Sequence, residues 1–247
     1  MSTLRDRLNA LDVTLMEHTV SQMLVADKRS VLALHAAIAD RLGHFTYLEI
    51  GSYKGGSLQA LVADERCRKI ISIDPRPEWV ADDRSELASG GWVYSDNTTQ
   101  GMLDGLATIP GADVSKVEAI ELGTDEIDPA GVDRPDICFV DGEHTHDAVL
   151  RDARFCRAAM RGSGVVAFHD FAIVPGAILE FVRESHPAFG YLLRHETFVV
   201  ELGTPTLFSD ARVKRQLRLP SPAWPLLNRL HGLRLLADAR RLRRRFR

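Results

Sequence analysis

Two groups of acidic and histidine residues each follow a run of apolar residues, and they are the first candidates for chemistry. Asp141 and His144 follow the run that ends at Val140, and Asp170 follows the run that ends at Phe168. If both runs are parallel strands of one sheet, their carboxyl ends lie at the same edge, where ligands bind in open α/β sheets. Two carboxylates in such a cleft favour a divalent cation, Mg2+ or Mn2+, because the cation offsets the repulsion between them. Asp141 and Asp170 are therefore predicted metal ligands, although a histidine-rich version of the site would suit Zn2+.

His144 is the predicted general base. It lies three residues after Asp141, within reach of a substrate hydroxyl whose pKa the cation would lower. His144 and Asp141 are thus the predicted catalytic residues. A structural alternative stays open, in which Asp141 and Asp170 cap the helices that follow them and His144 is exposed to solvent. His146 and His169 are weaker candidates, since His146 could point away along its helix and His169 could close its strand as a packed residue.

A glycine-rich turn supplies a second candidate site. Residues 47–57, YLEIGSYKGGS, form an apolar run that breaks at Gly51, and a second apolar run ends at Asp74, 23 positions beyond Gly51. Gly51 can adopt the backbone angles of a tight turn, and Gly55 and Gly56 let the next helix begin close to a ligand. A carboxylate at Asp74 can accept hydrogen bonds from both ribose hydroxyls of a nucleoside cofactor.

Tyr53 narrows the choice of cofactor. The dinucleotide-binding fingerprint has glycine at this position so that a pyrophosphate can touch the backbone, and a tyrosine side chain would block that approach. S-adenosylmethionine carries no phosphate and tolerates the bulk. The alternative is an ordinary strand-to-helix loop, but Glu49 in the preceding strand and Asp74 after the next one favour a cofactor site.

The size and composition of the chain fit one large α/β domain. It has 247 residues, of which 45% are hydrophobic and 26% charged, enough for a substantial core but not for a second full domain. Its three cysteines have no C-x-x-C spacing and are predicted to be reduced core thiols of a cytoplasmic protein. No signal peptide or membrane-spanning run is recognisable.

Short apolar runs alternate with helical stretches along the chain. This alternation predicts an α/β fold with a Rossmann-like, doubly wound sheet of seven strands, mostly parallel with the last strand antiparallel, and helices on both faces. Residues 1–45 are expected to form a helical cap whose last helix ends at Gly43, and residues 46–212 the cofactor-binding domain. The strands are predicted at 46–50, 69–73, 117–122, 136–140, 164–169, 191–201 and 205–208. Helices are predicted at 98–108 and 174–186, and the long segment 75–116 is predicted to hold a mobile loop that closes over the substrate.

The C-terminal tail, residues 213–247, differs in charge from the rest of the chain. It contains eleven of the 31 basic residues and one of the 34 acidic residues, so its net charge is near +10 and that of the remainder near −13. Leucines recur in it at helical spacing from residue 226, which predicts a basic amphipathic helix. Its partner could be an anionic membrane surface, an acidic protein, the body of the protein or a second subunit of a homo-oligomer. Nucleic acid is disfavoured, because the acidic body would repel phosphates. The predicted location is cytoplasmic, and peripheral to a membrane if the tail binds one.

Residues 46–171 resemble class I S-adenosylmethionine-dependent methyltransferases, specifically the branch with macrolide and aminocoumarin sugar O-methyltransferases and proteins described as cephalosporin hydroxylases. Four blocks carry the resemblance: residues 49–57 (EIGSYKGGS), 73–74 (ID), 139–144 (FVDGEH) and 168–170 (FHD). The resemblance implies S-adenosylmethionine as cofactor, bound by Glu49, Gly51, Ser52, Tyr53, Gly55, Ser57, Asp74, Thr124 and Asp125, the last two flanking the adenine. It also implies that Asp141 and Asp170 bind a metal ion and that His144 is the general base.

One residue departs from the pattern of these relatives. Many metal-dependent members have Asn or Asp after the second aspartate as a third metal ligand, whereas this chain has Phe171. A third ligand would then come from elsewhere, such as Glu143 or the segment 75–116. The predicted function is O-methylation of a hydroxyl on a small molecule, a sugar-bearing natural product or a glycolipid. The alternatives are a catalytically inactive cofactor-binding accessory protein and a nucleotide-dependent oxidoreductase, against which Tyr53 argues.

Overall fold

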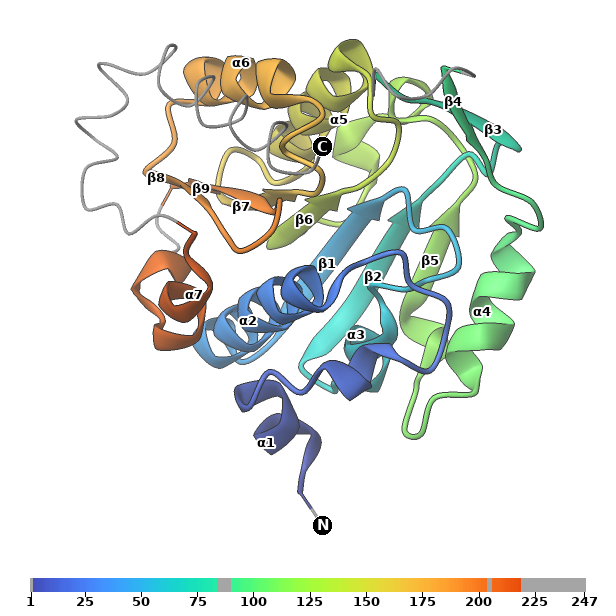
Figure 1. Ribbon diagram of the computed structural model, residues 1–247, viewed down its shortest axis with the longest axis vertical. Coiled ribbons are helices and arrows are strands. Elements are labelled where there is room, and N and C mark those ends of the chain that lie inside the picture. Colours follow the sequence, from blue (N-terminus) through green and yellow to red (C-terminus); the bar gives the residue numbers. More distant parts are fainter. Residues whose placement is uncertain (1, 84–89, 204–205, 219–247) are drawn as a thin grey trace.

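A seven-stranded sheet forms the centre of the molecule (Figure 1). The structure is a computed structural model that describes residues 2–83, 90–203 and 206–218. The strands of the sheet are β1 (Phe45–Ile50), β2 (Cys67–Ile73), β5 (Val117–Ile120), β6 (Ile137–Val140), β7 (Gly164–Phe168), β8 (Phe189–Leu192) and β9 (Phe198–Leu202). Their order is β5-β2-β1-β6-β7-β9-β8, and all neighbours are parallel except that β9 is antiparallel to both β7 and β8. The predicted fold, a mostly parallel sheet of seven strands whose last strand is antiparallel, is confirmed.

The register of the central strands brings their carboxyl ends to one edge. Ile50, the last residue of β1, pairs with Ile73 of β2 and with Val140 of β6. Val140 in turn pairs with Phe168, the last residue of β7. The residues that follow these four strands therefore lie side by side, as an open α/β sheet requires of a ligand site.

Helices cover both faces of the sheet. They are α1 (Leu4–Asn9), α2 (Val25–Leu42), α3 (Gln59–Ala63), α4 (Thr99–Ala107), α5 (His146–Ala159), α6 (Pro175–Ser185) and α7 (Ala211–Gln216), with 3-10 turns η1 (Val13–Met16), η2 (Val114–Lys116), η3 (Thr124–Glu126), η4 (Pro129–Gly131) and η5 (Leu207–Ser209). Two separate buried clusters result, one with side chains of α2, α3 and α4 and the other with side chains of α5 and α6. Tyr47 of β1 belongs to the first cluster and Leu48 to the second, because successive strand residues point to opposite faces.

The helix predicted to end the N-terminal cap is α2. Val31, Leu34, His35 and Ile38 are buried on it as the helical spacing indicates. It ends at Leu42, and the following residue, Gly43, has a left-handed φ of 74°, which glycine adopts without strain.

The end of the sheet differs from the prediction. The run expected as one strand, 191–201, is divided between β8 and β9, and His195 lies between them with a left-handed φ of 64°. The strand predicted at 205–208 is wrong, because Leu207 and Phe208 lie in η5. Their backbone N–H groups donate to the carboxylate of Glu201 at 3.0 and 2.7 Å, so this segment turns back onto β9 and does not pair as a strand.

The long segment between β2 and β5 contains a hairpin that the sequence did not reveal. Strands β3 (Trp79–Ala81) and β4 (Gly91–Val93) pair antiparallel, apart from the main sheet. Three-residue strands are too short to leave a readable alternation of apolar residues. The helix predicted at 98–108 is confirmed as α4, and Thr98 caps it by accepting a hydrogen bond from the N–H of Gly101.

The C-terminal tail falls largely on residues 219–247, which lie outside the described residues. Its predicted boundary, between 212 and 213, falls inside α7, which packs against α2 and buries Val213. The expected association of the tail with a membrane, an acidic protein or a second subunit stays a prediction. Within the described ranges, none of the helices combines the length and apolarity that a membrane span needs.

Candidate active site

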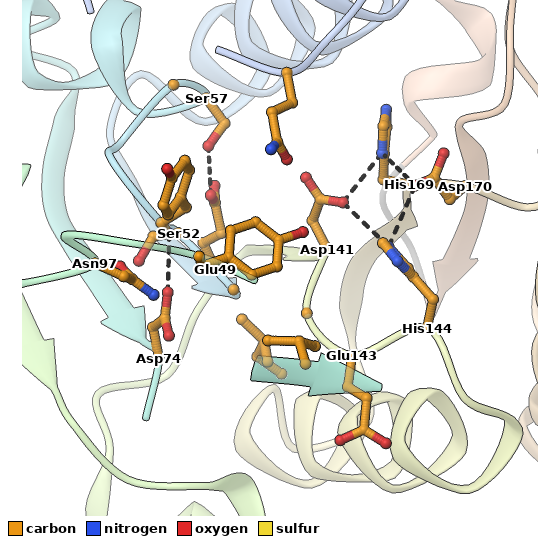
Figure 2. A pocket seen from close by; sticks show the side chains of 18 of the residues that line it. Glu49, Ser52, Ser57, Asp74, Asn97, Asp141, Glu143, His144, His169 and Asp170 are labelled. Atoms are coloured by element: carbon orange, nitrogen blue, oxygen red, sulfur yellow. Dashed lines mark hydrogen bonds and ion pairs between the residues drawn. The ribbon is translucent and has the colours of Figure 1, made fainter. Parts of the chain in front are cut away.

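A cavity of about 580 Å3 opens at the carboxyl edge of the sheet. The residues that follow β1, β2, β6 and β7 line it, together with residues 20–24 before α2 and parts of the hairpin β3–β4. Figure 2 shows side chains from these elements gathered around one space. The predicted catalytic and metal-binding residues, Asp141, His144 and Asp170, all line this cavity, and so does the glycine-rich turn.

Gly51 lets the turn after β1 approach the turn after β6. Its φ is 85°, and a Cβ at this position would lie 2.4 Å from the carbonyl oxygen of Asp141. A side chain at position 51 would therefore separate the two loops. Ser52, Tyr53 and Ser57, three of the predicted cofactor-binding residues, line the cavity beside it.

The two following glycines have different surroundings. Gly56 lines the cavity, and a Cβ on it would lie 2.8 Å from Cα of Ser21, so only glycine lets residues 20–24 cross above the turn. The Cβ position of Gly55, in contrast, faces Leu106 of α4 at 3.1 Å. The predicted cofactor-binding residue Gly55 therefore serves the packing of the turn on α4.

Asp74 lies in the wall of the cavity, as predicted, but it already has partners. Its carboxylate accepts hydrogen bonds from the backbone N–H groups of Tyr53 and Arg76, both at 2.9 Å. The Arg76 guanidinium lies 3.4 Å from the same carboxylate and donates to the side chain of Asn97 at 2.8 Å. Arg76 thus connects the glycine-rich turn, Asp74 and the residues just before α4. No pattern in the sequence marks it as a candidate site residue.

Glu49 is a buried acid at the inner end of the cavity. Its side chain accepts hydrogen bonds from the hydroxyls of Tyr47, at 2.6 Å, and Ser57. Burial raises the pKa of Glu49 to about 8, although both hydrogen bonds oppose this change. The side chain therefore carries a proton at neutral pH in the protein without cofactor.

The two consecutive residues predicted to flank the adenine differ in their exposure. Thr124 is buried and lines the cavity, whereas Asp125 is exposed and does not line it. Thr124 donates a hydrogen bond to Asp152, a residue of α5 that is 2% exposed and also lines the cavity. The sequence carried a signal for Asp152 that was missed: it is an acid on the apolar face of α5, between Val149 and Phe155.

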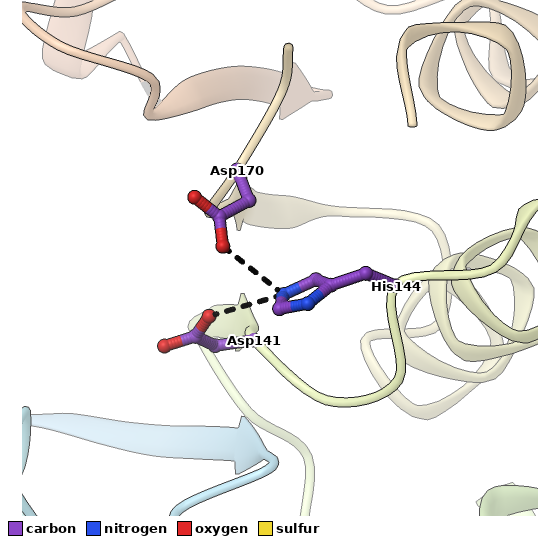
Figure 3. Close-up of side chains that lie close together, drawn as sticks. All are labelled: Asp141, His144 and Asp170. Carbon is purple, nitrogen blue, oxygen red and sulfur yellow. Dashed lines mark ion pairs between the residues drawn. The ribbon is translucent and has the colours of Figure 1, made fainter. Parts of the chain in front are cut away.

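The three side chains predicted to do chemistry converge on one point (Figure 3). His144 Nε2 lies 3.3 Å from Asp170 Oδ2 and 3.8 Å from Asp141 Oδ1. One ligand atom from each of the three residues lies within 4.8 Å of the others. Such spacing suits a shared metal ion.

The capping alternative for these residues is wrong. The N-cap of α5 is Thr145, which accepts a hydrogen bond from the N–H of Ala148, and the N-cap of α6 is Val174. Nor is His144 exposed to solvent, because only 8% of its surface is accessible.

Asp82 fixes the orientation of His144. Its carboxylate lies 2.9 Å from His144 Nδ1 and is buried, and the two residues also form an isolated β-bridge. With Nδ1–H donating to Asp82, the other ring nitrogen faces Asp141 and Asp170. A carboxylate on the far side of an imidazole orients both general bases and metal ligands. Asp82 follows β3, so the hairpin that the sequence did not reveal also supplies this partner.

Three further ionisable residues extend the site toward α2. His169 Nδ1 lies 3.0 Å from Asp141 Oδ1, so this residue faces the cavity and does not merely close its strand. Asp27 of α2 and His195 also line the cavity, with Asp27 Oδ2 2.9 Å from His195 Nδ1. His146, in contrast, points away toward Glu180 and has a half-exposed side chain.

The carboxylates and imidazoles stabilise one another in their charged forms. Burial lowers the pKa of His144, but the nearby carboxylates of Asp141, Asp82 and Asp170 outweigh it and raise the pKa to about 9. The pKa of His169 is raised in the same way, chiefly by Asp141. Burial also opposes the ionisation of Asp141 and Asp170, yet the pKa of each lies below its ordinary value, mainly because of His169. The site therefore presents ionised carboxylates at neutral pH.

This donor set fits a divalent cation, although Glu143 does not supply the third ligand; the other suggested source, the segment 75–116, includes residues 84–89, which lie outside the described residues. Glu143 points away from the cluster (Figure 2), and its carboxylate accepts a hydrogen bond from Thr145 at 2.7 Å. Phe171 is 1% exposed and stacks on Phe198 with ring centroids 4.9 Å apart. Position 171 is therefore part of the core behind the site.

Comparison with known proteins places this geometry in a family. Residues 48–171, half of the chain, match the family model described as "Methyltransferase domain". The chain belongs to this methyltransferase family. The matched range begins in β1 and ends directly after Asp170, so it contains the glycine-rich turn, Asp74 and the acidic cluster of this methyltransferase. The prediction of an S-adenosylmethionine-dependent methyltransferase with a Rossmann-like fold is confirmed. The family match disfavours the alternative of a nucleotide-dependent oxidoreductase.

Individual relatives are distant. "Uncharacterized protein R132" of Acanthamoeba polyphaga mimivirus is 28% identical over 144 residues, which cover 56% of the methyltransferase and 59% of the viral protein, less than two thirds of its length. Among solved structures, CalS11, a calicheamicin methyltransferase, matches with a TM-score of 0.51 at 14% identity, covering 80% of this chain and 91% of that one. The O-methyltransferase NovP matches with a TM-score of 0.50 at 13% identity, covering 79% and 78%. At such identities these two likenesses show the fold.

Proposed function

We propose that this methyltransferase transfers the methyl group of S-adenosylmethionine to a hydroxyl of an amphipathic small molecule, a sugar-bearing natural product or a glycolipid, with the help of a divalent cation. One observation carries the proposal. The imidazole of His144, oriented by Asp82, faces the carboxylates of Asp141 and Asp170 in the same cavity as the glycine-rich turn. A methyl donor and a deprotonating centre can therefore act on one acceptor there.

The reaction needs alignment and the removal of one proton. The acceptor oxygen attacks the methyl carbon in line with the departing sulfur, the C–O bond forms as the C–S bond breaks, and the sulfonium becomes a neutral thioether. The hydroxyl proton passes to His144 Nε2, while Asp82 holds the other ring nitrogen. Glu49, Ser57 and Asp74 would hold the cofactor from the β1–β2 side.

Asp141 and Asp170 would hold the cation, Mg2+ or Mn2+. When bound, it would supply Lewis acidity that lowers the pKa of the acceptor hydroxyl. His144 must be neutral to accept a proton, yet the same carboxylates raise its pKa to about 9. Carboxylates that are engaged with a cation stabilise an imidazolium less, so base function at neutral pH is coupled to occupancy of Asp141 and Asp170.

The mouth of the cavity supports an amphipathic acceptor. Five of its lining residues are large apolar side chains that are nonetheless exposed, here called the apolar rim: Val20, Leu24, Trp79, Trp92 and Leu122. Their exposed fractions run from 42% to 60%. Exposed apolar groups gathered around a polar cavity mark a ligand site. Asp27, His169 and His195 are polar groups farther inside that could bind hydroxyls. A hydroxylated end of the acceptor would enter the cavity, and an apolar part would remain at the rim.

The proposal is tested with purified protein by calorimetric titration with S-adenosylmethionine and by methyl transfer to a panel of sugar-bearing acceptors. We expect Asp141→Ala to abolish turnover and spare cofactor affinity, and His144→Ala to lower turnover strongly. His146→Ala is the matched control, because this histidine is the first residue of α5 and lies outside the cavity. This variant should leave turnover and cofactor affinity unchanged. Absence of cofactor binding refutes the proposal. Full activity of both cavity variants after chelation refutes the roles of the cation and the base.

The rim has its own test. Trp79→Ala combined with Trp92→Ala should raise KM for acceptors that carry an apolar group and leave KM for the corresponding free sugar unchanged. An equal effect on both acceptors would show that the indoles serve the cofactor or the fold and not the apolar part of the acceptor.

A further inference from the structure

His169 holds a nitrogen inside the cluster of metal-binding candidates. It follows β7 directly, so the register that sets Val140 opposite Phe168 also sets the next residue beside Asp141. Its Nδ1 lies 3.0 Å from Asp141 Oδ1 and 3.5 Å from Asp170 Oδ2. Figure 2 shows its ring on the side of the cluster opposite His144.

The close contact of His169 with Asp141 does not have the direction of a hydrogen bond. Within the described part of the chain, both ring nitrogens of His169 are buried and neither has a hydrogen-bond partner. Nδ1 thus lies at ion-pair distance from two carboxylates, 3.0 and 3.5 Å, without a hydrogen bond to either. A buried nitrogen of this kind is costly unless something else binds it.

The separations match those of atoms that share one metal ion. Ligands about 2.1 Å from a cation are about 3.0 Å apart at neighbouring corners of an octahedron and about 3.4 Å apart in a tetrahedron. The distances from His169 Nδ1 to Asp141 and Asp170, 3.0 and 3.5 Å, fall at these values. His144 Nε2 lies 3.3 Å from Asp170 but 3.8 Å from Asp141, so His169 is the imidazole that lies within 3.5 Å of both carboxylates. Asp82 holds the other ring nitrogen of His144.

The side chains at two other positions considered for a third ligand are directed elsewhere. Phe171 is packed on Phe198, and Glu143 faces Thr145. Imidazole nitrogen is a softer ligand than carboxylate oxygen and suits Mn2+, Fe2+, Co2+ or Zn2+, whereas Mg2+ prefers oxygen ligands only.

We propose that His169 Nδ1 is the third protein ligand of the cation held by Asp141 and Asp170, and that the site therefore selects a transition-metal ion such as Mn2+ over Mg2+. This inference rests on the proposed function only for the presence of a cation. His144 remains outside the ligand set and keeps its role in proton transfer.

The test uses the full-length protein, stripped with chelator and loaded with Mn2+. Electron spin echo envelope modulation detects a nitrogen bonded to Mn2+ without reference to activity. We expect nitrogen coupling in the wild type, in His144→Ala and in the control His146→Ala, and its loss in His169→Ala. We also expect Mn2+ affinity to fall about tenfold or more in His169→Ala. Loss of a residue that is hydrogen-bonded to a metal ligand already lowers affinity by about tenfold, and loss of a ligand should cost at least as much. Equimolar Mg2+ should not displace Mn2+ from the wild type.

Several results would overturn the inference. Nitrogen coupling that survives in His169→Ala and disappears in His144→Ala would assign the ligand to His144. Mn2+ binding without nitrogen coupling in the wild type would leave only oxygen ligands, and this measurement needs no variant to fold. Absence of Mn2+ binding would refute the proposed metal site. The proposed methyl transfer would still be tested separately, by cofactor binding and by activity.

Discussion

Replacing Glu49 by glutamine tests the electrostatics of the cofactor site. Glu49 is 1% exposed and its pKa is raised to about 8, chiefly by burial. Glutamine keeps the shape and the ability to bond with the hydroxyls of Tyr47 and Ser57, but it cannot ionise. The variant therefore removes the contribution of this ionisation to folding and leaves the packing in place.

The size of the effect follows from the two protonation equilibria. In the unfolded chain Glu49 loses its proton near pH 4.5, whereas in the folded protein it keeps the proton up to about pH 8. The stability linked to the protonated form is thus complete below pH 4.5 and is lost as the pH rises toward 8. One pKa unit corresponds to about 1.4 kcal/mol, so the loss is about 1 kcal/mol at pH 5 and about 3 kcal/mol at pH 7.

Urea denaturation of the cofactor-free, chelated protein at the two pH values provides the measurement. The free energy of unfolding of Glu49→Gln, relative to the wild type, should rise by about 2 kcal/mol between pH 5 and pH 7. Any effect of glutamine that does not depend on pH cancels in this comparison. The reasoning is refuted if the difference between variant and wild type is the same at both values.

The same variant separates stability from cofactor binding. S-adenosylmethionine carries a positive sulfonium, and a cation next to Glu49 favours its ionised form. Binding at pH 7 should therefore release protons from the wild type, visible as a calorimetric heat that depends on the buffer, and Glu49→Gln should bind more weakly without this release. Glu201→Gln is the matched control, because Glu201 is equally buried and has a raised pKa but belongs to β9 and does not line the cavity. It should leave cofactor binding unchanged.

Three other substitutions follow from local geometry. Gly51→Ala should abolish cofactor binding, because its Cβ would lie 2.4 Å from a carbonyl oxygen of the neighbouring loop, whereas Gly43→Ala, with a similar φ and open space around it, should cost only about 1–2 kcal/mol of stability by thermal unfolding. Asp82→Asn should lower kcat by about 10–100-fold and spare cofactor affinity, because a neutral amide no longer stabilises the positive charge that the imidazole gains when it accepts the proton. The neighbouring Asp83→Asn should not lower kcat, and an unchanged kcat in Asp82→Asn would contradict the role of Asp82. Asp64→Ala should destabilise the protein by about 1–3 kcal/mol in urea denaturation, because it leaves buried His35 without its hydrogen-bond partner and partly buried Arg66 with Asp40 alone, and an unchanged stability would contradict this.

Much of the sheet and half of the site could be predicted because their signals are local. A buried strand and the glycine turn or carboxylate at its end are contiguous in the chain, and the register of parallel strands brings four such places together without further information. This was enough to place Gly51, Asp74, Asp141 and Asp170 in one cavity. The division of residues 191–201 into two strands was not predictable in this way, because the turn at His195 contains no glycine or proline to mark it.

The contributions of Asp82 and His169 could not be predicted from spacing, for a common physical reason. Each depends on where a side chain points in a folded environment, and not on where its residue falls along a strand or helix. Asp82 reaches His144 only because a hairpin of three-residue strands carries it across the mouth of the cavity. The departure at Phe171 drew attention to a missing ligand one residue after Asp170, whereas the structure places an available nitrogen one residue before it. The strand ends at Phe168, and Asp170 has a left-handed φ of 50°, so the chain turns there and Phe171 packs against Phe198 in the core, whereas His169 shares the cavity with Asp141.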